Sequence, residues 1–152
     1  MINLNLPLYN FKFRFDKNRQ YIFDEVRKKY VVNTPEEWVR QNFLKYLVTE
    51  KSYPQSLISL EYEIKVNRLS KRCDAVIFNR KGISKMIIEF KAPDIIINQH
   101  SFDQIVRYNT KLMVPFLLVS NGLKHFCCKI DYEKNDYSYI KEIPTFDVLC
   151  DH

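Results

Sequence analysis

Residues 72–78 read Arg-Cys-Asp-Ala-Val-Ile-Phe, and residues 85–93 read Lys-Met-Ile-Ile-Glu-Phe-Lys-Ala-Pro. Both segments are short and mostly apolar, which is typical of buried strands. The link between them, residues 79–84, contains Gly82, one of only two glycines in the chain. A glycine in a short polar link indicates a hairpin turn. We therefore expect the two segments to pair as neighbouring strands, and the rest of the fold to form around this pair.

Polar side chains at the ends of these strands are candidates for a metal-binding or catalytic site. Because side chains alternate along a strand, Ile87, Glu89 and Lys91 should share one face. A carboxylate and an ammonium at the end of a buried strand are costly unless they are paired or coordinated. Asp74, on the neighbouring strand, is within reach of Glu89. Two carboxylates beside a lysine suit Mg²⁺ and a phosphate substrate, with the lysine orienting water or stabilising charge; a surface hairpin with a solvated ion pair is the alternative.

Length and composition place broad limits on the protein. The 152 residues fit a single domain, and 46% hydrophobic with 28% charged residues is ordinary for a globular chain. No apolar run is long enough to cross a membrane, and the N-terminus lacks the features of a signal peptide, so we expect a cytoplasmic protein without a membrane partner.

The four cysteines have no zinc-site spacing and are interpreted as reduced thiols. A net charge of +6 suits a polyanionic partner, although a solvated basic surface is the simpler explanation for each cluster alone.

The remaining pattern predicts a mixed α/β domain. We treat residues 1–152 as one domain, with an N-terminal β extension over 1–32 and a core over 33–144. In chain order we expect a strand over 11–15, extended segments at the start and end of 21–32, a helix from 34 to about 50, a strand over 60–66, the hairpin, a helix from 101 to about 113, and strands over 115–120, 124–132 and 137–143. The helix between the Glu89 strand and the strand over 115–120 makes a βαβ-like crossover.

Both helix starts carry capping residues. Thr34 can cap the first helix with Pro35 at its first position, and Glu37 can complete a capping box, which is sufficient by itself to explain that acidic residue. Ser101 and Gln104 have the same spacing at the second helix. On that helix Gln104 and Tyr108 are four residues apart and share a face, with Arg107 and Lys111 beside it. They could hydrogen-bond a phosphate or a metal-bound water, or form the polar rim of an ordinary amphipathic helix.

These motifs together resemble a known family. Asp74 followed by Glu89-Phe90-Lys91 is similar to the Asp…Glu-x-Lys signature of the PD-(D/E)XK nuclease superfamily, with Cys73 where a proline often stands. Further segments make the likeness specific: residues 22–29, 34–41, 72–76, 88–93, 104–109 and 121–122. From about residue 7 to 144, the chain resembles the nuclease domain at the N-terminus of type I restriction enzyme R subunits. The Gln-x-x-x-Tyr element at Gln104 and Tyr108 is the most telling part of that likeness.

The resemblance implies a restriction-endonuclease-like core, a central mixed β-sheet flanked by helices, and Mg²⁺-dependent hydrolysis of DNA phosphodiester bonds, with Mn²⁺ as a substitute. It implies that Asp74, Glu89 and the Phe90 backbone carbonyl bind the metal and that Glu37 reaches it directly or through water. Lys91 would be the catalytic lysine, and Gln104 and Tyr108 would support the scissile phosphate or that lysine. We assign DNA contacts to Arg72, Lys85, Arg107 and Lys111.

Family members continue into ATP-driven translocase domains, whereas this chain carries no phosphate loop, so we expect no ATP site within it. Its partners would be DNA, with a second copy or the subunits of a restriction or defence complex. Two other hypotheses stay open: a non-catalytic DNA-binding or assembly module that retains the nuclease fold, and a protein-interaction domain whose basic face only aids solubility.

Overall fold

The predicted hairpin is the centre of the larger sheet. The computed structural model describes residues 1–151. In it β5 (Leu69–Phe78) and β6 (Ser84–Phe90) pair antiparallel, and Gly82 turns the link with a φ of 80°. The other elements are, in chain order, β1 (Phe13–Asp16), β2 (Arg19–Asp24), β3 (Lys29–Val32), α1 (Pro35–Glu50), the 3₁₀ helix η1 (Gln55–Leu57), β4 (Ile58–Val66), α2 (Gln99–Thr110), β7 (Phe116–Ser120), β8 (His125–Asp131), β9 (Asp136–Ile140) and α3 (Phe146–Cys150).

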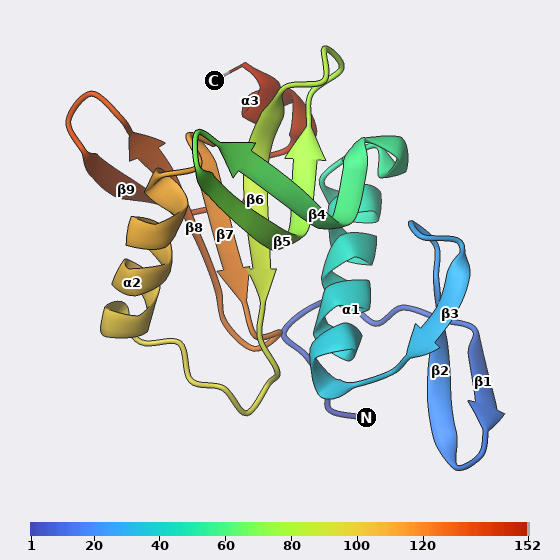
Figure 1. Ribbon diagram of the computed structural model, residues 1–152. Helices are drawn as coiled ribbons and strands as arrows, with labels where there is room; N and C mark the ends of the chain where they lie inside the picture. Colours follow the sequence, from blue (N-terminus) through green and yellow to red (C-terminus); the bar gives the residue numbers. More distant parts are fainter. Residues whose placement is uncertain (152) are drawn as a thin grey trace.

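The strands of this sheet follow the order β4-β5-β6-β7-β8-β9 (Figure 1). β6 and β7 are parallel and are joined through α2, while every other neighbouring pair is antiparallel. A parallel pair needs a crossover connection, and α2 provides it. The predicted α/β fold with a mixed central sheet is therefore confirmed.

The N-terminal extension forms a separate antiparallel sheet, β1-β2-β3, beside the N-terminal half of α1 (Figure 1). Arg27 is one of the side chains that join it to the core, because Arg27 contacts both Asp24 of β2 and Glu37 of α1. No helix within residues 1–151 is long and apolar enough to span a bilayer.

α1 begins as expected, but one detail of its cap is different. The Thr34 side chain accepts a hydrogen bond from the Glu37 backbone N–H at 3.0 Å, and Pro35 is the first helical residue. The Glu37 side chain does not complete a capping box, because its carboxylate binds Arg27, Arg40 and Gln41 instead.

The predicted start of α2 is wrong. The cap is Asn98, whose side chain accepts from the Ser101 N–H at 2.9 Å, while the Ser101 hydroxyl accepts from the Asn98 N–H at 3.0 Å. Ser101 is thus the third helical residue, the reciprocal partner of the cap rather than the cap itself. The short C-terminal α3 was not expected from the sequence; Thr145 caps it, and Phe146 and Leu149 bury it in the core.

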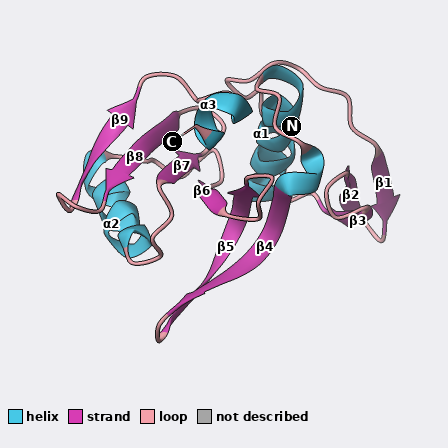
Figure 2. Ribbon diagram, turned by 90° about the horizontal axis from the view of Figure 1, so that it is seen from above, coloured by secondary structure: helices cyan, strands magenta, loops and turns pink. Residues whose placement is uncertain are grey.

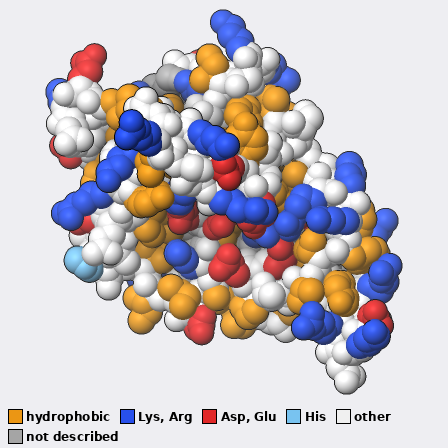
Figure 3. Space-filling view, in the orientation of Figure 1, with side chains coloured by type: hydrophobic (Ala, Val, Ile, Leu, Met, Phe, Trp, Pro, Cys, Tyr) orange, Lys and Arg blue, Asp and Glu red, His pale blue; other side chains and the backbone are white. Residues whose placement is uncertain are grey.

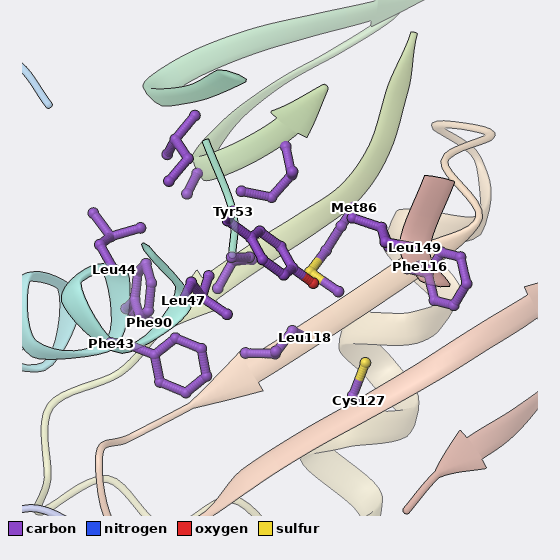
Figure 4. Close-up of a cluster of buried hydrophobic side chains, with 14 of the residues drawn as sticks. Phe43, Leu44, Leu47, Tyr53, Met86, Phe90, Phe116, Leu118, Cys127 and Leu149 are labelled. Carbon is purple, nitrogen blue, oxygen red and sulfur yellow. The ribbon is translucent and has the colours of Figure 1, made fainter. Parts of the chain in front are cut away.

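Two hydrophobic cores lie on opposite faces of the large sheet (Figure 2). The first joins α1 and α3 to side chains such as Ile88 and Phe90; Figure 4 shows Phe43, Leu44 and Leu47 of α1 within it. The second joins Phe102 and Val106 of α2 to the other face. Burial on both faces explains why β6 and β7 read as continuous apolar runs.

β5 changes faces beside Asp74. Cys73 belongs to the core under α2, whereas Ala75 belongs to the core under α1, although alternate residues of a regular strand share a face. On β4, Leu60 pairs with Ala75 and Tyr62 with Cys73, and Glu61 between them has a left-handed φ of 52°. Such a conformation is strained for a residue other than glycine. The regular alternation of the β4–β5 hairpin is therefore interrupted at the position of Asp74.

Candidate functional site

The Asp74 strand and the Glu-x-Lys strand meet as predicted. Ala75 pairs with Ile88, which places Asp74 and Glu89 at neighbouring positions on adjacent strands. The Asp74 Oδ2 accepts a hydrogen bond from the Phe90 backbone N–H at 2.8 Å. Asp74 is therefore fixed against the backbone of the Glu89-Phe90-Lys91 segment.

A cavity of about 480 Å³ opens beside this segment, between β6 and α2. It joins Glu89 and Lys91 to both members of the Gln-x-x-x-Tyr element, Gln104 and Tyr108, although the four residues come from two elements. The lining residues are Lys71, Glu89, Lys91, Ile95, Ser101, Gln104, Ile105, Tyr108 and Asn109. The crossover geometry produces this meeting, because α2 returns over the end of β6 before entering β7.

Burial raises the pKa of Asp74 above its ordinary value, although the Phe90 N–H and the positive charges of Arg40 and Lys91 favour the ionised form. Neighbouring carboxylates add to the effect, since the charge of Glu61 also raises the pKa. A cation bound beside Asp74 would favour the ionised form that burial disfavours.

Glu36, which sequence reasoning did not single out, is the α1 carboxylate coupled to Asp74. Burial raises the pKa of Glu36, and the charge of Asp74 raises it further, while Arg40 and Lys91 act in the opposite direction. The charge of Asp74 on β5 therefore acts on Glu36 in the first turn of α1.

The structure gives both carboxylate oxygens of Glu37, the residue expected to reach the metal, partners within the protein. Its Oε1 accepts from Arg27 at 3.0 Å and from Arg40 at 2.6 Å, and its Oε2 accepts from Arg40 and Gln41 at 2.9 Å each. Burial alone would raise the pKa of Glu37, but the Arg40 and Gln41 hydrogen bonds and the two arginine charges hold it below its ordinary value. Glu37 is thus fully engaged as an anchor for two arginines.

Lys71 is the second residue that sequence reasoning missed. Its Nζ contacts Glu89 Oε1, lies 3.4 Å from Asn109 Oδ1 and stands 4.9 Å from the centroid of the Tyr108 ring. Burial, together with the like charge of Lys91, lowers the pKa of Lys71, while Cys73 and Asp74 act to raise it. Glu89 is therefore engaged by a lysine other than the one in the Glu-x-Lys motif.

The four residues assigned to DNA contacts do not form one group. Arg107 and Lys111 lie together on a groove of about 980 Å³ between α2 and the β8–β9 turn, which shares Gln104 and Tyr108 with the smaller cavity. Arg72 bonds Glu61 at 3.1 Å. Lys85 lies near the start of β6, at the other end of the strand from Glu89. There its positive charge acts to lower the pKa of the Cys150 thiol. On the face seen in Figure 3, Lys and Arg side chains lie above and on both sides of a central group of acidic ones.

The expected metal, Mg²⁺, needs few ligands from the protein. Within residues 1–151, no group of three or more His, Cys, Asp or Glu side chains is placed to hold a metal ion. Mg²⁺ takes one or two carboxylates and completes its shell with water and phosphate oxygens. Asp74 and Glu89 supply that number.

No curated protein matches the chain. Among solved structures, the chain is similar to a fragment described as an HsdR subunit of a type I restriction enzyme from Vibrio vulnificus YJ016, with a TM-score of 0.49 and 20% identity. The similarity covers 71% of this chain but 23% of that one, so this chain spans well under half of its length.

A family model described as "Type I restriction enzyme R protein N terminus (HSDR_N)" matches residues 35–144, which run from the first residue of α1 to just before α3. That range contains Asp74, Glu89, Lys91, Gln104 and Tyr108 and makes up more than half of the chain. The chain therefore belongs to the family of type I restriction enzyme R protein N-terminal regions.

Proposed function

We propose that this chain is a Mg²⁺-dependent DNA endonuclease of the PD-(D/E)XK type, which acts as part of a restriction or defence complex in the cytoplasm. The observation that carries the proposal is the meeting of Asp74 with the Glu89-Phe90-Lys91 segment beside a cavity that also holds Gln104 and Tyr108. Membership in the R-subunit family supports the choice of DNA as the substrate.

Asp74 and Glu89 would hold the metal, with the Phe90 carbonyl as a further oxygen ligand and Glu36, in place of Glu37, as the helix carboxylate acting through water. When bound, Mg²⁺ would polarise the scissile phosphate and lower the pKa of a coordinated water. The Phe90 N–H bond keeps Asp74 in place for this task, and a fixed ligand costs less reorganisation during the reaction.

The remaining roles belong to groups that line the cavity. Lys91 supplies a positive charge at the same rim as Glu89, where it would orient the attacking water or stabilise charge on the phosphate. Gln104 and Tyr108 carry an amide and a phenol that can donate to phosphate oxygens. Arg107 and Lys111, on the adjoining groove, would contact the DNA backbone away from the scissile bond.

One observation favours a second candidate, a DNA-binding or assembly module with little catalysis. The carboxylate of Glu89 is already engaged by the Lys71 ammonium. Such a module would bind DNA without a metal, and its binding would weaken with salt.

A cleavage assay separates the two candidates. Wild type, Lys91→Met and the control Lys81→Met are incubated with supercoiled plasmid and with circular single-stranded DNA in Mg²⁺, Mn²⁺ or EDTA. Lys81 is a matched control because it is an exposed lysine in the 79–84 turn, at the far end of the hairpin. The endonuclease predicts metal-dependent cleavage that Lys91→Met abolishes and Lys81→Met retains. DNA binding with no cleavage in either metal would favour the second candidate.

A further inference from the structure

The Lys71 ammonium lies among groups that attract positive charge. Its Nζ contacts Glu89 Oε1 on β6 and lies within 3.4 Å of Asn109 Oδ1 on α2. The face of the Tyr108 ring covers it at 4.9 Å. A carboxylate, an amide oxygen and an aromatic face all attract positive charge. Because the side chains of Lys71 and Glu89 are only 18% and 13% exposed, little water competes with these partners.

The same carboxylate is needed by the metal. Asp74 and Glu89 occupy neighbouring positions on β5 and β6, and a divalent ion held between them must take an oxygen of each. In the described structure, the ammonium of Lys71 engages Glu89 on this side of the sheet. An ammonium and a divalent ion that bind the two oxygens of one partly buried carboxylate repel each other.

We propose that Lys71 is a tethered cation that occupies the Glu89 side of the metal site and must leave Glu89 before a divalent ion binds. This inference rests on the proposed metal site. Lys71 would act as a positioning residue, because it holds Glu89 in place while the metal is absent and lowers the apparent affinity of the site for metal. Metal would then bind the chain only at concentrations high enough to displace the Lys71 ammonium from Glu89.

Calorimetric titration of the intact chain with Mn²⁺ tests the competition directly. Lys71→Met removes the ammonium and should tighten Mn²⁺ binding by about tenfold or more. The reason is that Mn²⁺ would no longer have to displace a charge-assisted hydrogen bond between Lys71 and Glu89. Lys71→Arg keeps the charge and should bind Mn²⁺ no more tightly than wild type. Lys65→Met is the matched control, because Lys65 lies on the same hairpin, one register position away from Lys71, with a side chain that is 74% exposed. It should leave the affinity within about twofold, since an exposed charge is screened.

Thermal unfolding gives a second readout that also monitors folding. Without metal, Lys71→Met leaves Glu89 without its ammonium partner, so its unfolding temperature should fall below that of wild type. Saturating Mn²⁺ should raise the unfolding temperature of Lys71→Met by more than it raises that of wild type, because a ligand that binds the folded state stabilises it in proportion to its affinity.

The outcomes separate this inference from the proposed function. Mn²⁺ binding that Glu89→Gln abolishes, but that is equally tight in wild type and Lys71→Met, would overturn the competition and leave the metal site standing. Mn²⁺ binding to none of the variants would remove the metal site itself, and the competition with it.

Discussion

Glu37 organises a network of charges at the start of α1. It binds Arg27 from the N-terminal extension and Arg40 from its own helix, and Arg40 also donates to Glu61 on β4 at 2.6 Å. Glu37 is only 7% exposed. A buried carboxylate with two arginine partners is costly to remove, because the arginines then lose their acceptor.

Replacing Glu37 by Gln should therefore lower the free energy of unfolding by about 3 kcal/mol, measured by urea denaturation at pH 7. Because its folded pKa is depressed, Glu37 contributes stability above its ordinary pKa of 4.5 and loses it as the pH falls through the lower folded value. The difference between wild type and Glu37→Gln should therefore shrink in acid. The matched variant Glu36→Gln should not lower stability at pH 7, because burial and Asp74 already disfavour the Glu36 charge. Equal losses in both variants would contradict this assignment.

Single residues show where sequence reasoning fails. The sequence predicted that the Asp74 strand meets the Glu89–Lys91 segment, because motif spacing indicates neighbouring strands, and the structure places Gln104 and Tyr108 beside that segment. Lys71 was missed because strict alternation places it with Ala75, on the face away from Glu89; the change of faces opposite the left-handed Glu61 reverses this. Glu36 and Glu37 are adjacent on one helix, and the sequence alone does not show that Glu37 binds the two arginines while the charge of Asp74 raises the pKa of Glu36.

At the scale of elements, α2 depends on its first turn. The reciprocal Asn98–Ser101 bonds satisfy two backbone N–H groups that would otherwise lack partners. This turn leads into the helix face that carries Gln104 and Tyr108, so its stability helps to position the wall of the cavity.

Asn98→Ala should lower the free energy of unfolding by about 1 kcal/mol, as measured by chemical denaturation. The loss should be similar for Ser101→Ala, because each residue supplies half of the motif. If Ser101→Ala were destabilising and Asn98→Ala were neutral, Ser101 would be the true cap and the register of α2 would be wrong.

Sequence patterns predicted the type and order of most elements. Apolar runs marked β6 and β7, which are buried on both faces, and the hairpin link was clear from Gly82. The start of α2 was predicted three residues late, because Ser101 is also a typical capping residue and only the hydrogen bonds identify Asn98 as the cap. α3 was missed because five residues are too few to show a helical period, and its stability comes from the burial of Phe146 and Leu149.

At the scale of the whole molecule, the N-terminal segment is fastened to the turn after β7. The Asn5 N–H donates to the Gly122 carbonyl at 2.8 Å, and the Asn5 carbonyl lies 2.9 Å from His125 Nε2. Gly122 has a φ of 85°, and a Cβ there would stand 2.7 Å from Leu4 Cδ2 and 3.1 Å from Val39 Cγ2. Only glycine fits this contact without displacing the segment or α1.

Gly122→Ala should therefore destabilise the protein by about 2 kcal/mol, through left-handed strain and crowding together. The N-terminal segment should also become more sensitive to limited proteolysis. Gly82→Ala is the matched control, because Gly82 has a similar φ but open space around its Cα, so it isolates the backbone strain. Equal effects of the two variants would show that the Leu4 contact contributes nothing.

The net charge of +6 is expected to act through particular places on the surface. If Arg107 and Lys111 contact phosphates, the double variant Arg107→Gln/Lys111→Gln should reduce the slope of log affinity for DNA against log salt by about two. The pair Lys17→Gln/Lys81→Gln, both exposed and away from the groove, should leave the slope unchanged. Fluorescence anisotropy in EDTA measures both, and equal changes would assign the binding to overall charge.

The most direct test of metal-dependent hydrolysis is the rate constant of strand cleavage by wild type and by Asp74→Asn in saturating Mg²⁺. Asn retains an oxygen that can accept the Phe90 N–H bond, so the substitution removes the charge while keeping the local contact. Wild type should cleave only with metal, and Asp74→Asn should be slower by about a thousandfold at an unchanged unfolding temperature. Equal rates for the two proteins, or cleavage by wild type in EDTA, would contradict the proposed mechanism.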